Sequence, residues 1–241
     1  IVVAPDHTGN TLFDDSPGPL PPQLFELRPQ DISAALDKVL NLPADDPLHG
    51  VVGSPIVAAG HSFGGYTMLA LGGAAFDVDA LVNSCADEFD EDICSYITPE
   101  VIERLSPGLF DDRIEAIVPM APGGYAAFGA GVAAIDVPVL LMTGGVDTFT
   151  TDEAEGDPIW AALDGPNDIR IAIPAAGHFT FSDACRLSLP VPNNDSCGPE
   201  NIDTNEAHPV LAQFVLSFAL GDFAAFDAPS PHPGILIVHK E

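Results

Sequence analysis

Short, continuously apolar segments alternate with stretches in which apolar residues recur every three or four positions. The apolar segments at residues 1–4, 56–59, 116–120, 137–142 and 169–173 are predicted to be buried strands. Helical spacing predicts helices over residues 32–40, after Ser62, near residues 99–105, and from about residue 207 to 220. Strands that are apolar on both faces and alternate with helices are typical of a parallel sheet covered on both sides. The pattern therefore predicts an α/β fold, in which the strand-like tail at residues 234–238 has no assigned place.

The composition suits one domain with a large core, because 46% of the 241 residues are hydrophobic. Acidic residues number 36 against 7 basic ones, which gives a formal net charge of −29. Nucleic acids and anionic membranes are therefore not expected as partners. No apolar run reaches the roughly 18 residues that a membrane span requires. The acidity suggests adaptation to salty surroundings, a hypothesis that a melting temperature independent of salt would contradict.

The four cysteines form two local pairs in sequence, Cys85 with Cys94 and Cys185 with Cys197. Four cysteines allow three connectivities, and proximity favours two small loops. Neither pair has C-x-x-C spacing, so a zinc or thioredoxin-like role is not expected. Two disulfides would indicate a secreted or periplasmic protein, whereas free buried thiols are the alternative.

A serine lies between a predicted strand and a predicted helix, in the sequence Gly60-His61-Ser62-Phe63-Gly64-Gly65. A tight turn at that junction projects the serine hydroxyl from the edge of the sheet. Glycines two positions before and after the serine are expected because a Cβ there would collide with neighbouring backbone. We predict Ser62 as a nucleophile and the Phe63 amide as an oxyanion donor; a structural loop serine is the alternative.

Two further residues with suitable chemistry follow later strands. Asp147 comes after the strand at 137–142, and His178 comes after the strand at 169–173. In an open parallel sheet, functional residues gather at the carboxyl ends of the strands. We predict His178 as the base that accepts the Ser62 proton and Asp147 as the carboxylate that orients it. Asp152 is the nearest rival to Asp147.

The remaining histidines are assigned lesser roles. His61 must point away from the Ser62 hydroxyl and is expected to pack, whereas His7 follows a strand and could line the pocket. His49, His208, His232 and His239 are not at strand ends and are expected to be solvated or capping residues. No metal-ligand spacing is present, so neither a metal nor a cofactor is predicted.

Several segments together resemble α/β-hydrolases of the platelet-activating-factor acetylhydrolase and predicted dienelactone hydrolase type. They are residues 4–11, 28–31, 60–65, 138–141 and 177–183, and the likeness extends from residue 1 to about Leu220. The resemblance implies an α/β-hydrolase fold and a secreted or periplasmic serine hydrolase of carboxylic esters, with Ser62, Asp147 and His178 as its triad. Family members have an earlier strand and a loop that supplies a second oxyanion amide. Both are expected to be missing from this chain, so that a preceding N-terminal segment would complete the fold.

We therefore expect a hydrolase core at residues 1–76 and 114–241, with an acidic insertion at 77–113 over the active-site edge. The predicted activity is hydrolysis of a small-molecule or polymeric ester through an acyl-enzyme. One alternative is a lactone or dienelactone hydrolase, although serine at position 62 argues against the dienelactone type, which uses cysteine. Another is an inactive binding domain that keeps the fold.

Overall fold

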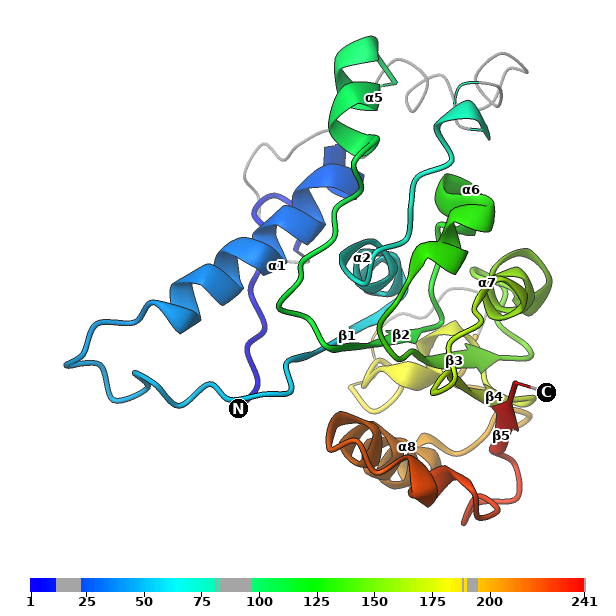
Figure 1. Ribbon diagram of the computed structural model, residues 1–241. Helices are drawn as coiled ribbons and strands as arrows, with labels where there is room; N and C mark the ends of the chain where they lie inside the picture. Colours follow the sequence, from blue (N-terminus) through cyan, green and yellow to red (C-terminus); the bar gives the residue numbers. More distant parts are fainter. Residues whose placement is uncertain (12–22, 81, 83–96, 188, 190–194, 241) are drawn as a thin grey trace.

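The computed structural model describes residues 1–11, 23–80, 82, 97–187, 189 and 195–240, and has a mostly parallel sheet at its centre (Figure 1). Within these ranges the strands are β1 (Val57–His61), β2 (Ala116–Met120), β3 (Leu140–Gly144), β4 (Ile169–Ile173) and β5 (Leu236–His239). They lie side by side in chain order. Strands β1 to β4 are parallel, and β5 is antiparallel to β4. The carboxyl ends of β1, β3 and β4 therefore lie at the same edge of the sheet.

Helices cover both faces of the sheet. The described helices are α1 (Leu24–Leu40), α2 (Phe63–Leu71), α5 (Pro99–Leu105), α6 (Tyr125–Phe128), α7 (Asp157–Ala162) and α8 (Thr204–Ala219). Shorter turns are η2 (Gly129–Ala134), η3 (Asp152–Gly156), η4 (His178–Phe181) and η6 (Phe223–Phe226). Figure 1 shows α1, α2, α6 and α7 on one side of the sheet and α8 on the other. The predicted α/β architecture is thus confirmed.

Alternate residues of the central strands β2 and β3 enter two separate cores. On β2 and β3, Ile117 and Leu141 pack with α2, whereas Val118 and Leu140 pack with α8. Because side chains alternate between the two faces of a strand, a continuously apolar strand fills both cores at once. This is why the short apolar runs in the sequence located the central strands correctly.

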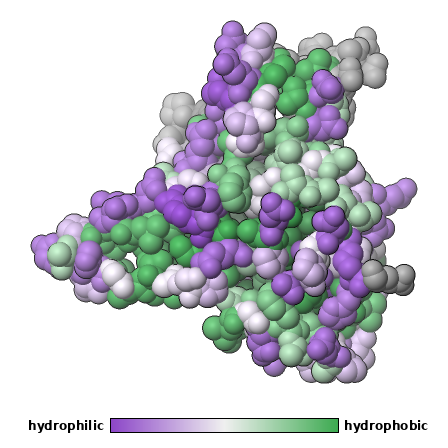
Figure 2. All heavy atoms as spheres, in the orientation of Figure 1, coloured by the Kyte–Doolittle hydropathy of each residue, from purple (hydrophilic) through white to green (hydrophobic). Residues whose placement is uncertain are grey.

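The predicted buried strand at residues 1–4 is wrong. Ile1, Val2 and Val3 are 79%, 92% and 50% exposed, and no strand of the described residues pairs with this segment. Other exposed apolar side chains occur at Leu40 and in the loop that follows α1. In Figure 1, the end of α1 and the loop after it lie at the left, and the same part of Figure 2 has green patches beside purple ones. The apolar composition of residues 1–4 predicted a buried strand, but this segment has no pairing partner in the described sheet.

Three other predicted elements have different boundaries in the structure. The first helix begins at Leu24, eight residues before the predicted start, and includes Pro29. The third central strand is displaced toward the carboxyl end, to Leu140–Gly144, and the tail forms β5. No helix in the described ranges is long and apolar enough to cross a membrane.

A disulfide joins Cys185 to Cys197, with an S–S distance of 2.04 Å, as predicted. The pair Cys85 and Cys94 lies outside the described residues, which include 77–80, 82 and 97–113 of the predicted insertion at 77–113. Of that segment, α5 is bound to α1 through Arg104, whose Nε and Nη2 donate to the Glu26 carboxylate at 2.7 and 3.0 Å.

Candidate active site

Ser62 occupies a sharp turn between β1 and α2. Its φ of 57° lies in the left-handed region, which a non-glycine residue rarely adopts. The Ser62 amide donates to the Met120 carbonyl of β2 at 2.9 Å, which anchors the turn to the sheet. A Cβ on Gly60 would lie 2.6 Å from the Gly64 carbonyl carbon, so only glycine fits at that position. The turn has the geometry expected of a nucleophile elbow.

A second close contact of the turn was predicted at Gly64, and the structure has it at Gly65 instead. A Cβ on Gly64 meets no atom of the described residues within 4 Å, so the predicted collision there is wrong. A Cβ on Gly65 would instead lie 2.7 Å from the Pro122 Cα. Gly65 is thus the residue that lets α2 approach the loop after β2, because the helix turns Gly65 rather than Gly64 toward that loop.

The three side chains singled out in the sequence form a hydrogen-bonded chain. The Ser62 Oγ lies 2.8 Å from the His178 Nε2, and the His178 Nδ1 lies 2.9 Å from the Asp147 Oδ2. His178 and Asp147 are 4% and 5% exposed. The carboxylate on Nδ1 selects the tautomer in which Nδ1–H donates to Asp147, which leaves Nε2 free to accept the serine proton.

Asp152, the rival to Asp147, does not contact His178. Its Oδ1 lies 2.9 Å from the Arg170 Nη2, on the face of β4 opposite α8. Arg170 also donates to Asp157 at 2.7 Å and to the Thr143 hydroxyl at 3.1 Å. This cluster around the buried Arg170 contacts the start of α7 and leaves Asp147 as the carboxylate at the imidazole.

The loop after β3 keeps Asp147 ionised. Burial alone would raise the pKa of the Asp147 carboxyl, but hydrogen bonds from His178, from the Thr150 and Phe149 amides and from the Thr150 hydroxyl lower it below its ordinary value. Both amides donate to Oδ1 at 2.8 Å. The loop therefore folds around the carboxylate and aims Oδ2 at the imidazole.

Thr150 is a site residue that the sequence analysis missed. Its hydroxyl lies 2.8 Å from the Asp147 Oδ2, 3.1 Å from the His178 Nδ1 and 3.0 Å from the Ala121 carbonyl. It thus connects Asp147, His178 and the loop after β2. A threonine three residues after an aspartate at a strand end is the only sequence signal, and such turns are common in ordinary loops.

His61 packs against the His178 ring and also forms a hydrogen bond with the His178 backbone. Its Nε2 donates to the His178 carbonyl at 2.8 Å, and the two ring centroids lie 4.7 Å apart. Burial above all, and then the neighbouring His178, lowers the pKa of His61 to about 4. His61 is therefore a neutral donor that joins the elbow to the loop of the base.

The predicted pocket role of His7 is not supported by its contacts. Its Nδ1 lies 2.8 Å from the Asp31 carboxylate of α1, and the ring is 9% exposed. Nearby, Arg28 donates to Asn10 at 2.6 Å and to the Thr67 hydroxyl of α2 at 3.4 Å. The loop that contains His7 is therefore attached to α1 and α2.

Aromatic rings surround the hydrogen-bonded chain. Phe149 and Phe179 each have ring centroids 5.1 Å from that of His178, and Phe149 is 47% exposed. Phe63, the first residue of α2, packs 4.9 Å from Phe25 and beneath the Arg28 guanidinium. The first amides of a helix have no acceptor within the helix, so the Phe63 N–H is a suitable donor to an anion beside Ser62.

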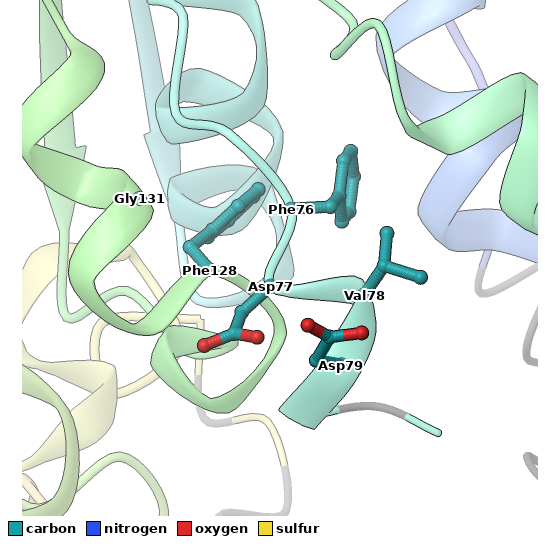
Figure 3. Close-up of a pocket in the computed structure, with 6 residues that line it drawn as sticks. All are labelled: Phe76, Asp77, Val78, Asp79, Phe128 and Gly131. Atoms are coloured by element: carbon teal, nitrogen blue, oxygen red, sulfur yellow. The ribbon is translucent and has the colours of Figure 1, made fainter. Parts of the chain in front are cut away.

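A separate hollow of about 360 Å³ lies beyond the carboxyl end of α2, the end opposite Ser62. Phe76, Val78, Phe128 and Gly131 line it together with Asp77 and Asp79 (Figure 3). Asp77 accepts the Ala80 amide at 2.8 Å, which gives it a structural role at the start of a turn. In the described part of the chain, no group of three or more potential metal ligands occurs.

Comparison with known proteins assigns no family. No protein-family model matches the chain, and no curated protein matches it at a significant level.

Proposed function

We propose that this protein is a serine hydrolase of carboxylic esters with an α/β-hydrolase fold. The observation that carries the proposal is the unbroken chain from the Ser62 Oγ through His178 to Asp147, with distances of 2.8 and 2.9 Å. The three residues follow three parallel strands of one sheet, which is where such folds place catalytic groups. A hydroxyl, an imidazole and a carboxylate in this order are the components of acyl transfer.

In the proposed mechanism, the Ser62 Oγ attacks the ester carbonyl carbon while the His178 Nε2 accepts the hydroxyl proton. The imidazolium that forms is stabilised by Asp147, whose carboxylate is already ionised and oriented by the Thr150 and Phe149 amides. His178 then protonates the leaving alcohol as the tetrahedral intermediate collapses to the acyl-enzyme. Water attacks this ester, with His178 again accepting a proton, and releases the carboxylic acid and Ser62.

Negative charge develops on the former carbonyl oxygen in both steps. The Phe63 amide supports its stabilisation, because it is the first N–H of α2 and the positive end of the helix dipole lies there. One oxyanion donor is worth about 10²–10³-fold in turnover. A second donor is part of the proposal, but none of the described residues is assigned to it.

Three features support the substrate class and the location. The exposed ring of Phe149 beside His178 favours an apolar acyl or alcohol group. The net charge of −29 favours a neutral ester over an anionic one. The Cys185–Cys197 disulfide is compatible with a secreted or periplasmic protein, since such bonds persist in oxidising compartments.

A fluorophosphonate probe and p-nitrophenyl esters test the proposal. Wild-type protein should be labelled at Ser62 and should hydrolyse the esters, whereas Ser62→Ala should lose both properties and stay folded. Ser106→Ala is the matched control, because Ser106 lies at the end of α5 and donates to the Ile102 carbonyl; it should retain both. Absence of labelling in the wild type would refute the proposal and favour an inactive domain.

A further inference from the structure

A buried carboxylate outside the proposed triad lies between the loops that contain Asp147 and His178. Asp195 is 5% exposed, and its neighbour Ser196 is 2% exposed. Both belong to the segment closed by the Cys185–Cys197 disulfide. Burying a carboxylate is costly unless hydrogen bonds compensate, so the partners of Asp195 show what the segment holds in place.

On one side, Asp195 binds the loop of the acid. The Thr148 amide donates to Asp195 Oδ2 at 3.1 Å, and the Thr148 hydroxyl donates to the same oxygen at 2.9 Å. Thr148 directly follows Asp147, whose own Oδ1 holds the next two amides of the loop. Asp195 thus accepts hydrogen bonds from Thr148 of this loop, while Asp147, which belongs to the loop, accepts those of the next two amides.

On the other side, the same segment packs against the loop of the base. A Cβ on Gly177, the residue before His178, would lie 2.7 Å from the Ser196 amide nitrogen and 2.6 Å from its hydroxyl oxygen. Ser196 has a φ of 75°, and its hydroxyl donates to Asp195 Oδ1 at 2.5 Å. Backbone-level contact at Gly177 means that any displacement of the segment is transmitted to His178.

Two further bonds hold the chain next to Asp195 and Ser196. The disulfide joins Cys197, two residues after Asp195, to Cys185. Further along, the Ile202 amide donates to the Ala175 carbonyl at 2.9 Å, in the loop that leads to His178. Both attachments, at Cys197 and Ile202, come shortly after the point where Asp195 and Ser196 contact the two loops.

We propose that Asp195 is a positioning residue that keeps Asp147 aligned with His178. This inference rests on the proposed hydrolase function for its effect on turnover, but its structural part does not. Asp195 does not contact the reacting atoms; it acts through Thr148 and through Gly177.

Three variants test the proposal. Asp195→Ala removes all three hydrogen bonds and should lower kcat about 10²-fold with little change in KM, since small displacements of catalytic groups have effects of that size. Asp195→Asn keeps an oxygen that can accept from Thr148 and should restore most of the turnover. Glu200→Ala removes an exposed carboxylate a few residues away and should behave as wild type. Rates are normalised by fluorophosphonate titration, so that loss of folded protein does not count as loss of turnover.

A proton NMR measurement tests the role of Asp195 without relying on enzyme activity. The His178 Nδ1–H that donates to Asp147 should give a low-field proton resonance, assigned by its absence in Asp147→Ala. This resonance should be lost or shifted in Asp195→Ala and kept in Asp195→Asn. An unchanged resonance and kcat in Asp195→Ala would overturn the proposal. Absence of esterase activity in the wild type would refute the hydrolase function alone, because the resonance still decides the role of Asp195.

A second variant applies if Asp195→Ala fails to fold. Thr148→Val removes only the hydroxyl donor and leaves the Thr148 amide bonded to Asp195. It should shift the same resonance and lower kcat in the same direction, by a smaller factor. A wild-type resonance and wild-type kcat in Thr148→Val would also count against the proposal.

Discussion

The partly buried imidazole of His61 should make the protein less stable in mild acid. Burial and the adjacent His178 lower the pKa of His61 from 6.5 to about 4. Below pH 6.5 the unfolded chain therefore binds a proton at this histidine that the folded chain does not. The stability contributed by His61 is fully present above that pH and is lost as the pH falls toward 4.

The size of the effect follows from the two pKa values. One pKa unit corresponds to about 1.4 kcal/mol, so the whole shift amounts to about 3 kcal/mol. Between pH 7.5 and pH 5 the free energy of unfolding should fall by about 2 kcal/mol through this group alone, because the folded protein remains almost unprotonated at His61. Acidic groups with lowered pKa values, such as Asp147 and Asp111, also stabilise the folded protein. Their contribution to the free energy of unfolding is lost at lower pH than that of His61, so the two effects overlap only in part.

Comparison of wild type with His61→Gln isolates the contribution. Glutamine is neutral throughout and keeps an N–H that can donate to the His178 carbonyl. Urea unfolding at both pH values, followed by the fluorescence of Trp160, the single tryptophan, gives the free energies. The pH dependence of His61→Gln should be smaller than that of wild type by about 2 kcal/mol. His49→Gln, which replaces an exposed histidine, serves as control. Equal pH dependence in wild type and His61→Gln would refute the reasoning.

Two further predictions concern stability. Replacing Cys185 and Cys197 by serine should lower the free energy of unfolding by about 3 kcal/mol, because the unfolded chain regains the entropy that closing a loop of this length removes. A urea midpoint equal to that of wild type would contradict this prediction. Gly60→Ala should cost about 1–3 kcal/mol and reduce fluorophosphonate labelling, because its Cβ would meet backbone. Gly64→Ala, with open space at its Cβ, should be tolerated, and similar losses in both variants would show that the collision is not the cause.

The sequence predicted the central strands and the relation of Ser62, Asp147 and His178 because local patterns encode both. Residues 116–120 are apolar on both faces and residues 169–173 are apolar apart from Arg170, and the structure forms strands over the same ranges. Parallel strands bring their carboxyl ends to one edge, so residues that follow them were expected to lie close together.

What the sequence did not predict depends on contacts between distant segments. Residues 1–4 have a strand-like composition, but pairing requires a neighbour, and none occurs in the described sheet. Thr150 and Asp195 are ordinary polar residues in loops, and only their hydrogen bonds to Asp147, His178 and Thr148 set them apart. Gly64 and Gly65 are equivalent in the sequence, and the direction of α2 decides which one meets Pro122.

The hydrogen bond between Ser62 and His178 joins positions 116 residues apart. Contacts of such long sequence separation form late in folding, because a long loop must be closed first. During synthesis, the serine hydroxyl is made well before the imidazole that would activate it. A growing chain therefore carries an unactivated alcohol until β4 has joined the sheet, and the proposed reactivity arises only after that step.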